Sequence, residues 1–300
     1  MKILVTGGTG FIGQRLVTHL IGEGHEVQLL TRDISRAKKQ FSQSPVESKL
    51  FFINSLDDAV AADAVINLAG EPLFAKRWNT ERKRRFAESR IATTTALVSW
   101  MAKSPPRVFL SGSAIGYYGD KGDQDIGENA PPAEYFASRL VQDWEQVALP
   151  AQELGVRVCL LRTGLVVGPN GGFLAQMLPP FKLGLGGPLG SGQQWMSWIH
   201  LEDMVGIIDF CLSQPVSGPI NCTAPNPVTN QAFSATLAGV LNRPAILRTP
   251  AAILKLVVGE GAYMLLTGQK VLPENVLASG YRFRYPQLRE ALENVMENIA

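Results

Sequence analysis

The sequence predicts an α/β fold in which a parallel sheet carries helices on both of its faces. Short apolar runs alternate with longer amphipathic stretches over the first half of the chain, which is typical of successive β-α-β units. A glycine-rich turn, Gly7-x-x-Gly10-x-x-Gly13, directly follows the first apolar run and precedes a helix-like stretch. Together these observations indicate a Rossmann-like, doubly wound parallel sheet.

The elements expected from these patterns follow in chain order. Apolar runs predict six strands, at Ile3–Thr6, Val27–Thr31, Leu50–Ile53, Ala64–Leu68, Arg107–Ser111 and Val156–Leu161. Amphipathic stretches predict helices at Phe11–Ile21, Glu81–Ala102, Glu134–Glu153 and Glu202–Leu212. Glycine and proline become frequent between Gly164 and Gly192, and the pattern after Pro225 is helical with proline breaks. We therefore expect a dinucleotide-binding domain of residues 1–164 plus about 201–222, and a smaller C-terminal substrate lobe of residues 165–200 and 223–300.

Composition narrows the class of protein. Apolar residues make up 46% of the chain and charged residues 18%, as expected for a globular protein. The net charge of +2 argues against a general nucleic-acid binder. Three cysteines without metal-ligand spacing indicate a reducing, cytoplasmic compartment and no metal site. Residues 251–266 are apolar but interrupted by Lys255 and Glu260, so they are too short and too charged to span a membrane. We expect a small-molecule substrate, with neither nucleic acid nor membrane as a partner, and the sequence leaves the oligomeric state open.

The glycine turn predicts a binding site for the pyrophosphate of a dinucleotide. Glycines let the backbone turn tightly and approach the phosphates, and the N–H groups and dipole of the following helix favour negative charge. A tight turn in an unrelated α/β protein is the alternative, but here the turn lies between the expected strand and helix. The residues expected to contact the cofactor are Gly7, Thr9, Gly10, Phe11, Ile12 and Gly13.

The end of the second expected strand favours NADP(H) over NAD(H). An acidic residue at this position holds the ribose 2′-OH of NAD, whereas a basic one suits the 2′-phosphate of NADP. Thr31-Arg32 occupies it here, and a guanidinium can form a fork-like contact with a phosphate. Asp33 follows one position later, where it could hold a ribose or cap the next helix.

Several motifs resemble one branch of the extended short-chain dehydrogenase/reductase superfamily. They are Asn67-Leu68-Ala69-Gly70-Glu71-Pro72, Arg77-Trp78, Ser89-Arg90, Leu161-Arg162-Thr163-Gly164, Leu183-Gly184-Leu185-Gly186-Gly187-Pro188 and Trp198-Ile199-His200. The chain resembles the atypical, NADP-linked "nucleoside-diphosphate-sugar epimerase-like" family, which has a short family-specific C-terminal segment. The resemblance runs the whole chain. It implies that the backbone of Leu68, Ala69 and Gly70 lies against the adenine and ribose of the cofactor and that Arg90 faces it, with Arg82, Lys83 and Arg84 at the surface.

The resemblance also implies a catalytic set. Enzymes of the superfamily move a hydride between the nicotinamide and a carbinol carbon. A tyrosine takes or gives the hydroxyl proton, a lysine four residues later lowers the pKa of that tyrosine and anchors the ribose, and a serine hydrogen-bonds the same substrate oxygen. Ser113 follows the fifth expected strand, and Tyr135-x-x-x-Arg139 has the tyrosine spacing with arginine in place of lysine. These two cations are not interchangeable. A turn serine and a core-packing aromatic are the structural alternatives for Ser113 and Tyr135.

The expected substrate side departs from sugar-nucleotide epimerases. The segment before His200 contains no arginine to pair with a diphosphate, and its Trp195, Met196 and Trp198 predict an apolar, stacking pocket. Tyr117 and Tyr118 are too close to Ser113 to replace the usual tyrosine but could line the pocket there. His200 could act as acid or base or form a structural hydrogen bond. The leading interpretation is an NADP(H)-binding oxidoreductase or epimerase-like protein that acts on a small carbonyl, polyol or sugar-type substrate. The alternative is a catalytically degenerate NADP(H)-binding regulatory or scaffold protein.

Overall fold

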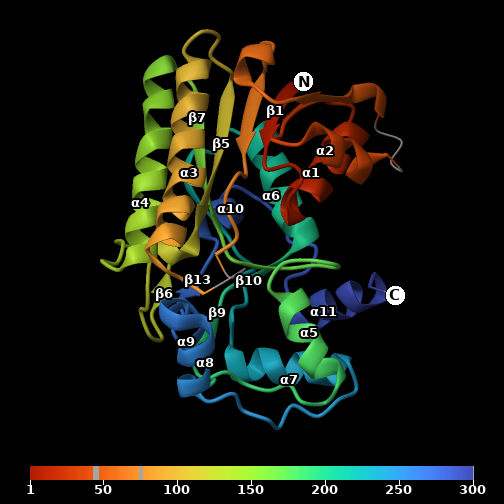
Figure 1. Cartoon of the computed structure of the whole chain (residues 1–300), viewed down its shortest axis with the longest axis vertical. Coiled ribbons are helices and arrows are strands. Elements are labelled where there is room, and N and C mark those ends of the chain that lie inside the picture. Colours follow the sequence, from red (N-terminus) through yellow and green to blue (C-terminus); the bar gives the residue numbers. More distant parts are fainter. Residues whose placement is uncertain (43–46, 74–76, 300) are drawn as a thin grey trace.

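A parallel sheet of seven strands forms the centre of the molecule. The computed structural model describes residues 1–42, 47–73 and 77–299. The strands lie in the order β11-β7-β5-β4-β1-β2-β3, and every neighbouring pair is parallel (Figure 1). Their bounds are β1 Lys2–Thr6, β2 Glu26–Leu30, β3 Leu50–Ile53, β4 Ala64–Asn67, β5 Val108–Ala114, β7 Arg157–Thr163 and β11 Gly218–Cys222. The predicted doubly wound, Rossmann-like α/β fold is confirmed.

Helices cover both faces of the sheet, as Figure 1 shows. On one side lie α1 (Phe11–Gly22), α2 (Ile34–Phe41) and α6 (Leu201–Ser213), and on the other α3 (Thr80–Met101) and α4 (Phe136–Ala148). The alternation of side chains along β1 explains the two layers. Ile3 and Val5 are buried in the core that includes α1 and α6, whereas Leu4 is buried in the core that includes α3. A strand buried on both faces is therefore continuously apolar.

The observed elements differ from the expected ones mainly at their ends. β5 extends past Ser111 to Ala114, which places Ser113 within the strand rather than in the turn after it. The helix expected over Glu134–Glu153 ends at Ala148 and continues as a 3₁₀ helix, Leu149–Leu154, in which Pro150 cannot donate an α-helical hydrogen bond. β11, an edge strand of the sheet, and α2 were not among the expected elements.

The rest of the chain adds helices and short strands, some of which build a second core. Its helices are α5 (Leu174–Lys182), α7 (Asn230–Val240), α8 (Ala251–Val258), α9 (Ala262–Leu266), α10 (Glu274–Ala278) and α11 (Leu288–Glu297). Short strands pair as β8 (Leu165–Val167) with β10 (Trp198–His200), β9 (Trp195–Met196) with β12 (Val228–Thr229), and β6 (Asp125–Ile126) with β13 (Lys270–Val271). Side chains of α5, α7 and α11 share one apolar cluster, while Val166, Ile199 and Val276 join the cluster of the main sheet. Among the described residues, no helix is long and apolar enough to cross a membrane.

Candidate functional site

The glycine turn after β1 is pressed tightly against the end of β4. Gly7 has φ +70°, a conformation that L side chains rarely adopt, and a Cβ there would overlap the Leu68 carbonyl. A Cβ at Gly13 would overlap the carbonyl oxygen of Gly7. Gly10 differs, because the nearest atom to a Cβ at this position is the Gly7 oxygen at 3.2 Å and the residue is exposed. Gly7 and Gly13 therefore fix the turn, and Gly10 leaves its outer side open.

The start of α1 has the features of an anion site. Gly10 is its N-cap, no side chain caps it, and its first turn carries no acidic residue. Thr9 is half-buried, and its carbonyl oxygen accepts a hydrogen bond from Gln14 Nε2 at 2.9 Å. Phe11 and Ile12 pack against the core, and the Phe11 ring also lies under the backbone of Gly171. The N–H groups at the N-terminus of α1 are thus held at the carboxyl end of the sheet, where α/β proteins bind their ligands.

The end of β2 presents a cation. Arg32 is exposed, and its side chain forms no hydrogen bond or ion pair with any other residue that the structure describes. Asp33 is the N-cap of α2, because its Oδ1 accepts from the Arg36 N–H at 2.9 Å. Thr31 joins this loop through its hydroxyl, which accepts from the Asp33 N–H at 3.3 Å. Of the two roles open for Asp33, the structure shows the helix cap.

Arg90 lies against the loop after β4. Its Nη2 donates to the Glu71 carbonyl at 3.1 Å and its Nη1 to the Phe86 carbonyl at 3.2 Å, with the guanidinium 5.3 Å from the Trp144 ring centroid. A Cβ at Gly70 would lie 3.0 Å from the Arg90 guanidinium. Burial lowers the pKa of Arg90 to about 10, with Glu71 opposing the shift. Arg90 therefore supports the backbone of the Leu68-Ala69-Gly70 segment.

The expectation that three neighbouring cations lie at the surface is only partly right. Arg84 has a side chain that is 62% exposed. For Arg82 the expectation is wrong, because its side chain is only 12% exposed. This side chain forms an ion pair with Glu71 at 3.2 Å and lies over the Phe86 ring. Lys83 is intermediate and pairs with Glu260 of the C-terminal segment.

Ser113 belongs to a buried hydrogen-bond network. Its Oγ donates to Glu145 Oε1 at 2.5 Å. The same carboxylate accepts from Arg162 Nε at 2.8 Å and from Arg162 Nη2 at 2.9 Å, and both charged side chains are nearly inaccessible. Arg162 also donates to the Tyr118 hydroxyl at 2.9 Å. Ser113 is thus held by a carboxylate whose charge the Arg162 guanidinium balances.

The aromatic pair Tyr117-Tyr118 is part of the same network. Tyr118 is fully buried and donates to Asn221 Oδ1 at 2.6 Å, so the expectation that it lines a pocket is wrong. The Tyr117 ring centroid lies 3.6 Å from the Arg162 guanidinium carbon. This stacking helps to hold Arg162 in place.

Tyr135 lies at the N-terminus of α4, outside the Ser113 network. Its hydroxyl donates to the Gly116 carbonyl at 3.3 Å, and its ring centroid is 5.0 Å from that of Tyr263. Burial, and then Tyr263, raise the pKa of Tyr135 to about 12. Arg139 is exposed and borders a surface hollow with Pro132. Among the described residues no hydrogen bond joins Ser113 to Tyr135, and none is formed by the Arg139 side chain.

The predicted apolar pocket before His200 is mostly core. Trp198 is fully buried, with its Nε1 donating to the Asn226 carbonyl at 3.0 Å, and Met196 is buried in the same cluster. The expectation of a stacking pocket is wrong for these two side chains. Trp195 is half-buried, donates to Asp123 Oδ1 at 2.8 Å and lies under the Lys270 ammonium.

His200 has a structural role. It is almost fully buried, and its Nδ1 accepts from the Glu202 N–H at 3.1 Å, which caps α6. Its ring stacks on Tyr285 with centroids 4.0 Å apart. Burial lowers the pKa of His200 to about 4. Of the two roles considered for this residue, the structural hydrogen bond is present.

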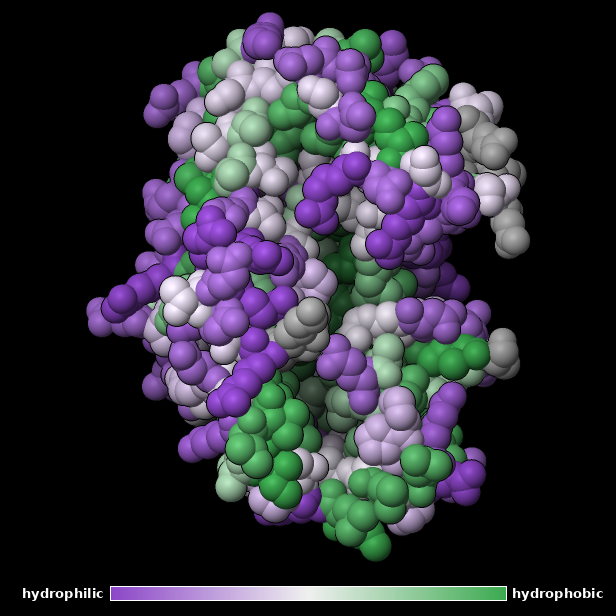
Figure 2. All heavy atoms as spheres, in the orientation of Figure 1, coloured by the Kyte–Doolittle hydropathy of each residue, from purple (hydrophilic) through white to green (hydrophobic). Residues whose placement is uncertain are grey.

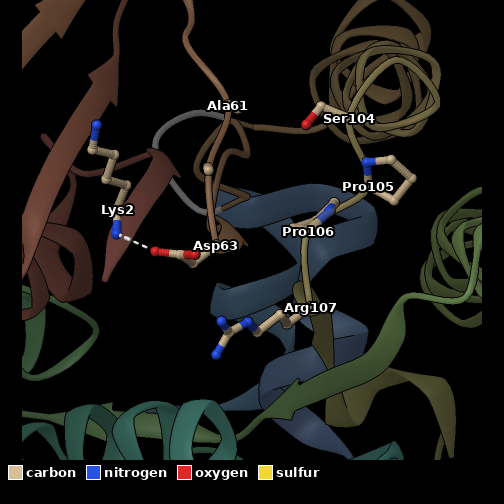
Figure 3. Close-up of a pocket in the computed structure, with 8 residues that line it drawn as sticks. Lys2, Ala61, Asp63, Ser104, Pro105, Pro106 and Arg107 are labelled. Atoms are coloured by element: carbon tan, nitrogen blue, oxygen red, sulfur yellow. Dashed lines mark hydrogen bonds between the residues drawn. The ribbon is translucent and has the colours of Figure 1, made fainter.

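A hollow at the opposite end of the sheet, where the strands begin, contains none of the candidate site residues described above. Figure 3 shows its lining, in which Lys2, Asp63 and Arg107 lie at the amino ends of β1, β4 and β5, and its volume is about 280 Å³. Ligands of open α/β sheets bind at the carboxyl ends of the strands. The candidate site is therefore the glycine turn and its neighbours at the other edge.

Sequence reasoning missed the partners of Ser113. Glu145 lies on the buried face of α4 together with Ser138, Val141 and Ala148. Arg162 directly follows the apolar run Val158–Leu161. A charge at a buried helical position and a second one within a buried strand are signals that such residues pair.

These features define the class of protein. A glycine turn and an uncapped helix N-terminus at the carboxyl end of the first strand of a parallel sheet are typical of dinucleotide-binding α/β proteins. The chain belongs to the NAD dependent epimerase/dehydratase family, whose model matches residues 3–223. Residues 249–295 match a domain of unknown function, DUF1731. The resemblance to an epimerase-like family with its own C-terminal segment is confirmed.

Relatives of known sequence or structure support this assignment. "Epimerase family protein SDR39U1 homolog, chloroplastic" from Arabidopsis thaliana is 41% identical over 304 residues, which cover 99% of this chain and 87% of the relative. The crystal structure of human epimerase family protein SDR39U1 (isoform 2) with NADPH has a TM-score of 0.89 and 36% identity, and the match covers 99% of this chain and 100% of the human one. UDP-glucuronic acid 4-epimerase from Bacillus cereus, in complex with UDP-glucuronic acid and NAD, has a TM-score of 0.79 at 18% identity, covers 100% and 99% of the two chains, and shows the same fold.

Proposed function

We propose that this protein is an NADP(H)-binding oxidoreductase or epimerase-like protein that acts on a small carbonyl, polyol or sugar-type substrate. The observation that carries the proposal is the glycine turn. Gly7 and Gly13 leave no room for a side chain, while Gly10 is open in front of an uncapped helix N-terminus. This combination suits a pyrophosphate, because the phosphate needs both close backbone approach and N–H donors.

The remaining residues suit the rest of the cofactor. The backbone of Leu68, Ala69 and Gly70 lies beside Gly7 and could hold the adenine and ribose, supported from behind by Arg90. Arg32 is exposed and available for a 2′-phosphate. The human relative solved with NADPH supports the choice of NADP. The cofactor, when bound, supplies or accepts a hydride at its nicotinamide.

The proposed catalytic residues are Ser113, Tyr135 and Arg139. Tyr135 would exchange the proton of the substrate hydroxyl, and Ser113 would hydrogen-bond the same oxygen. Burial, and then Tyr263, raise the pKa of Tyr135 to about 12, so its hydroxyl is protonated at neutral pH. A general acid works best with a pKa near the operating pH, so this role needs a nearby positive charge that lowers the pKa of Tyr135. Arg139 would supply the positive charge that lysine provides elsewhere in the superfamily. Its exposed side chain would have to turn toward Tyr135 to do so.

One arrangement favours the second candidate function, a regulatory or scaffold protein without turnover. Ser113 already donates its hydroxyl hydrogen to Glu145, and Arg139 is exposed rather than bonded to Tyr135. Both observations suit a chain that binds the cofactor without carrying out proton transfer. For either function we propose a reducing compartment such as the cytoplasm, since Cys159, Cys211 and Cys222 are buried thiols.

The proposal is tested by cofactor selectivity. NADPH and NADH are titrated against the protein by nicotinamide fluorescence, and the titration is repeated with Arg32→Ala. A charge-assisted contact to the 2′-phosphate is worth roughly 1.5–3 kcal/mol, so we expect NADPH to bind about ten- to a hundredfold more tightly, and Arg32→Ala to remove most of the difference.

A matched control comes from the opposite edge of the sheet. Arg107 is an exposed arginine at the amino end of β5 (Figure 3). Arg107→Ala should leave both affinities unchanged. Equal affinities of the parent protein for NADPH and NADH would contradict the role of Arg32, and no affinity for either would contradict the proposed function.

A further inference from the structure

An exposed apolar surface covers the end of the C-terminal lobe. It contains seven of the twelve exposed large apolar side chains of the described residues: Leu183, Leu185, Ile246, Leu247, Ile253, Leu256 and Val257. Three of them are more than 70% exposed: Leu183, Ile246 and Leu256. Figure 2 shows apolar side chains gathered at this end of the molecule, over α8 and the loops beside α7. We call these seven side chains the lobe-end surface.

The lobe-end surface comes from two segments of the chain that lie side by side. A Cβ at Gly187 would overlap the Leu247 backbone, and Leu189 pairs with Thr249. The loop after α5 therefore runs alongside the loop that enters α8. None of the eight residues of α8 is buried. Its inner face, Ala251, Leu254 and Val258, is only half-buried, and the apolar side chains of its outer face are left exposed.

All charged residues within the two segments that form this surface are positive, and Glu260, which follows α8, is paired with Lys83. Lys182, Arg243, Arg248 and Lys255 are all exposed, and none forms an ion pair with another described residue. Residues 163–201 and 223–259 contain no aspartate or glutamate at all. The lobe end thus carries four positive charges, although the whole chain has a net charge of only +2. Apolar side chains with a cationic border match the surface of an anionic bilayer, which offers a hydrophobic interior beneath negative headgroups.

We propose that the lobe-end surface docks on an anionic lipid bilayer. Ile246, Leu256 and their neighbours enter the interface, and Arg248, Lys255 and the other two cations contact lipid phosphates. A second copy of this chain fits less well, because a two-fold interface would place four cations opposite the same four cations. The expectation of no membrane partner rested on the apolar segment 251–266 being too short to span a bilayer. Binding at the surface does not require a span.

The test measures binding of the whole protein to vesicles. Co-sedimentation is compared for vesicles of phosphatidylcholine alone and of an equimolar mixture with phosphatidylglycerol. We expect binding to the anionic vesicles only, weakening as salt is added. Each lysine or arginine near an anionic membrane contributes a factor of roughly five. Arg248→Gln combined with Lys255→Gln should therefore weaken binding about 25-fold, and Leu256→Ser combined with Val257→Ser should weaken it at least as much.

Matched controls come from other faces of the molecule. Phe51→Ser removes an exposed apolar side chain of β3, and Arg84→Gln removes an exposed cation of α3. Neither should change vesicle binding, and all variants should keep the thermal unfolding of the parent. Equal binding to both kinds of vesicle, or none to either, would overturn the proposal. A second result would also overturn it: the protein binds no vesicles but forms a dimer in solution, and Leu256→Ser dissociates that dimer. The lobe-end surface would then bind a second copy of the chain.

Discussion

Replacing Glu145 by glutamine is expected to destabilise the fold more than any surface charge change. The substitution keeps the shape of the side chain and an oxygen that can accept from Ser113. It removes the negative charge that balances Arg162, whose guanidinium lies at 2.8 and 2.9 Å from the carboxylate oxygens. Arg162 is 3% exposed, so its charge cannot be hydrated instead.

The magnitude follows from this burial. Removing one partner of a buried ion pair costs about 3–5 kcal/mol, because the other charge is left uncompensated. Arg84→Ala, which breaks exposed pairs with Glu81 and Glu88, should cost no more than about 1 kcal/mol. The double variant Glu145→Gln/Arg162→Met contains no unbalanced charge. It should lose about 2 kcal/mol less than the sum of the two single variants.

The assay is urea unfolding at pH 7, followed by tryptophan fluorescence and far-ultraviolet circular dichroism. Coincident transitions by the two probes would justify the calculation of free energies of unfolding. A loss below about 1 kcal/mol for Glu145→Gln would refute the reasoning. Losses that simply add in the double variant would show that Glu145 and Arg162 are not coupled.

Three further predictions concern the turn, the pH dependence and catalysis. Gly10→Val should abolish NADPH binding in titrations, since its side chain would occupy the space of the pyrophosphate. The circular dichroism spectrum should be unchanged, because a Cβ at this position meets only the Gly7 oxygen at 3.2 Å. Retained affinity for NADPH would place the phosphates elsewhere. The pKa of His200 falls from 6.5 to about 4 on folding, so the unfolded chain takes up a proton more readily. The contribution of His200 to the free energy of unfolding should be full above pH 6.5 and decline by about 2–4 kcal/mol toward pH 4. In the capping variant His200→Asn, the free energy of unfolding in urea should depend less on pH. Tyr135→Phe should sharply lower kcat on a panel of carbonyl substrates, with little change in NADPH affinity. Arg139→Lys should preserve or raise this activity. A parent protein that reduces no member of the panel would favour the regulatory function.

The sequence alone determined six of the seven strands of the sheet, and the glycine turn. All six expected strands are present within a few residues, because each is a short apolar run that local spacing reveals. Gly7, Gly10 and Gly13 were also assigned to one turn from spacing alone, and the structure explains Gly7 by its positive φ and its contact with Leu68. These features depend on neighbours in the chain, or on the direct pairing of β1 with β4.

Only the tertiary structure decided which polar and aromatic side chains are buried and what they contact. Trp198 looked like a pocket residue and is core, and Arg82 looked like a surface residue and is largely covered. Tyr118 binds Asn221, 103 residues further along the chain, and Ser113 binds Glu145 across 32 residues. Local periodicity shows that a side chain faces inward, but its partner comes from an element placed beside it by the fold. The environment of Ser113 therefore could not be read from the sequence.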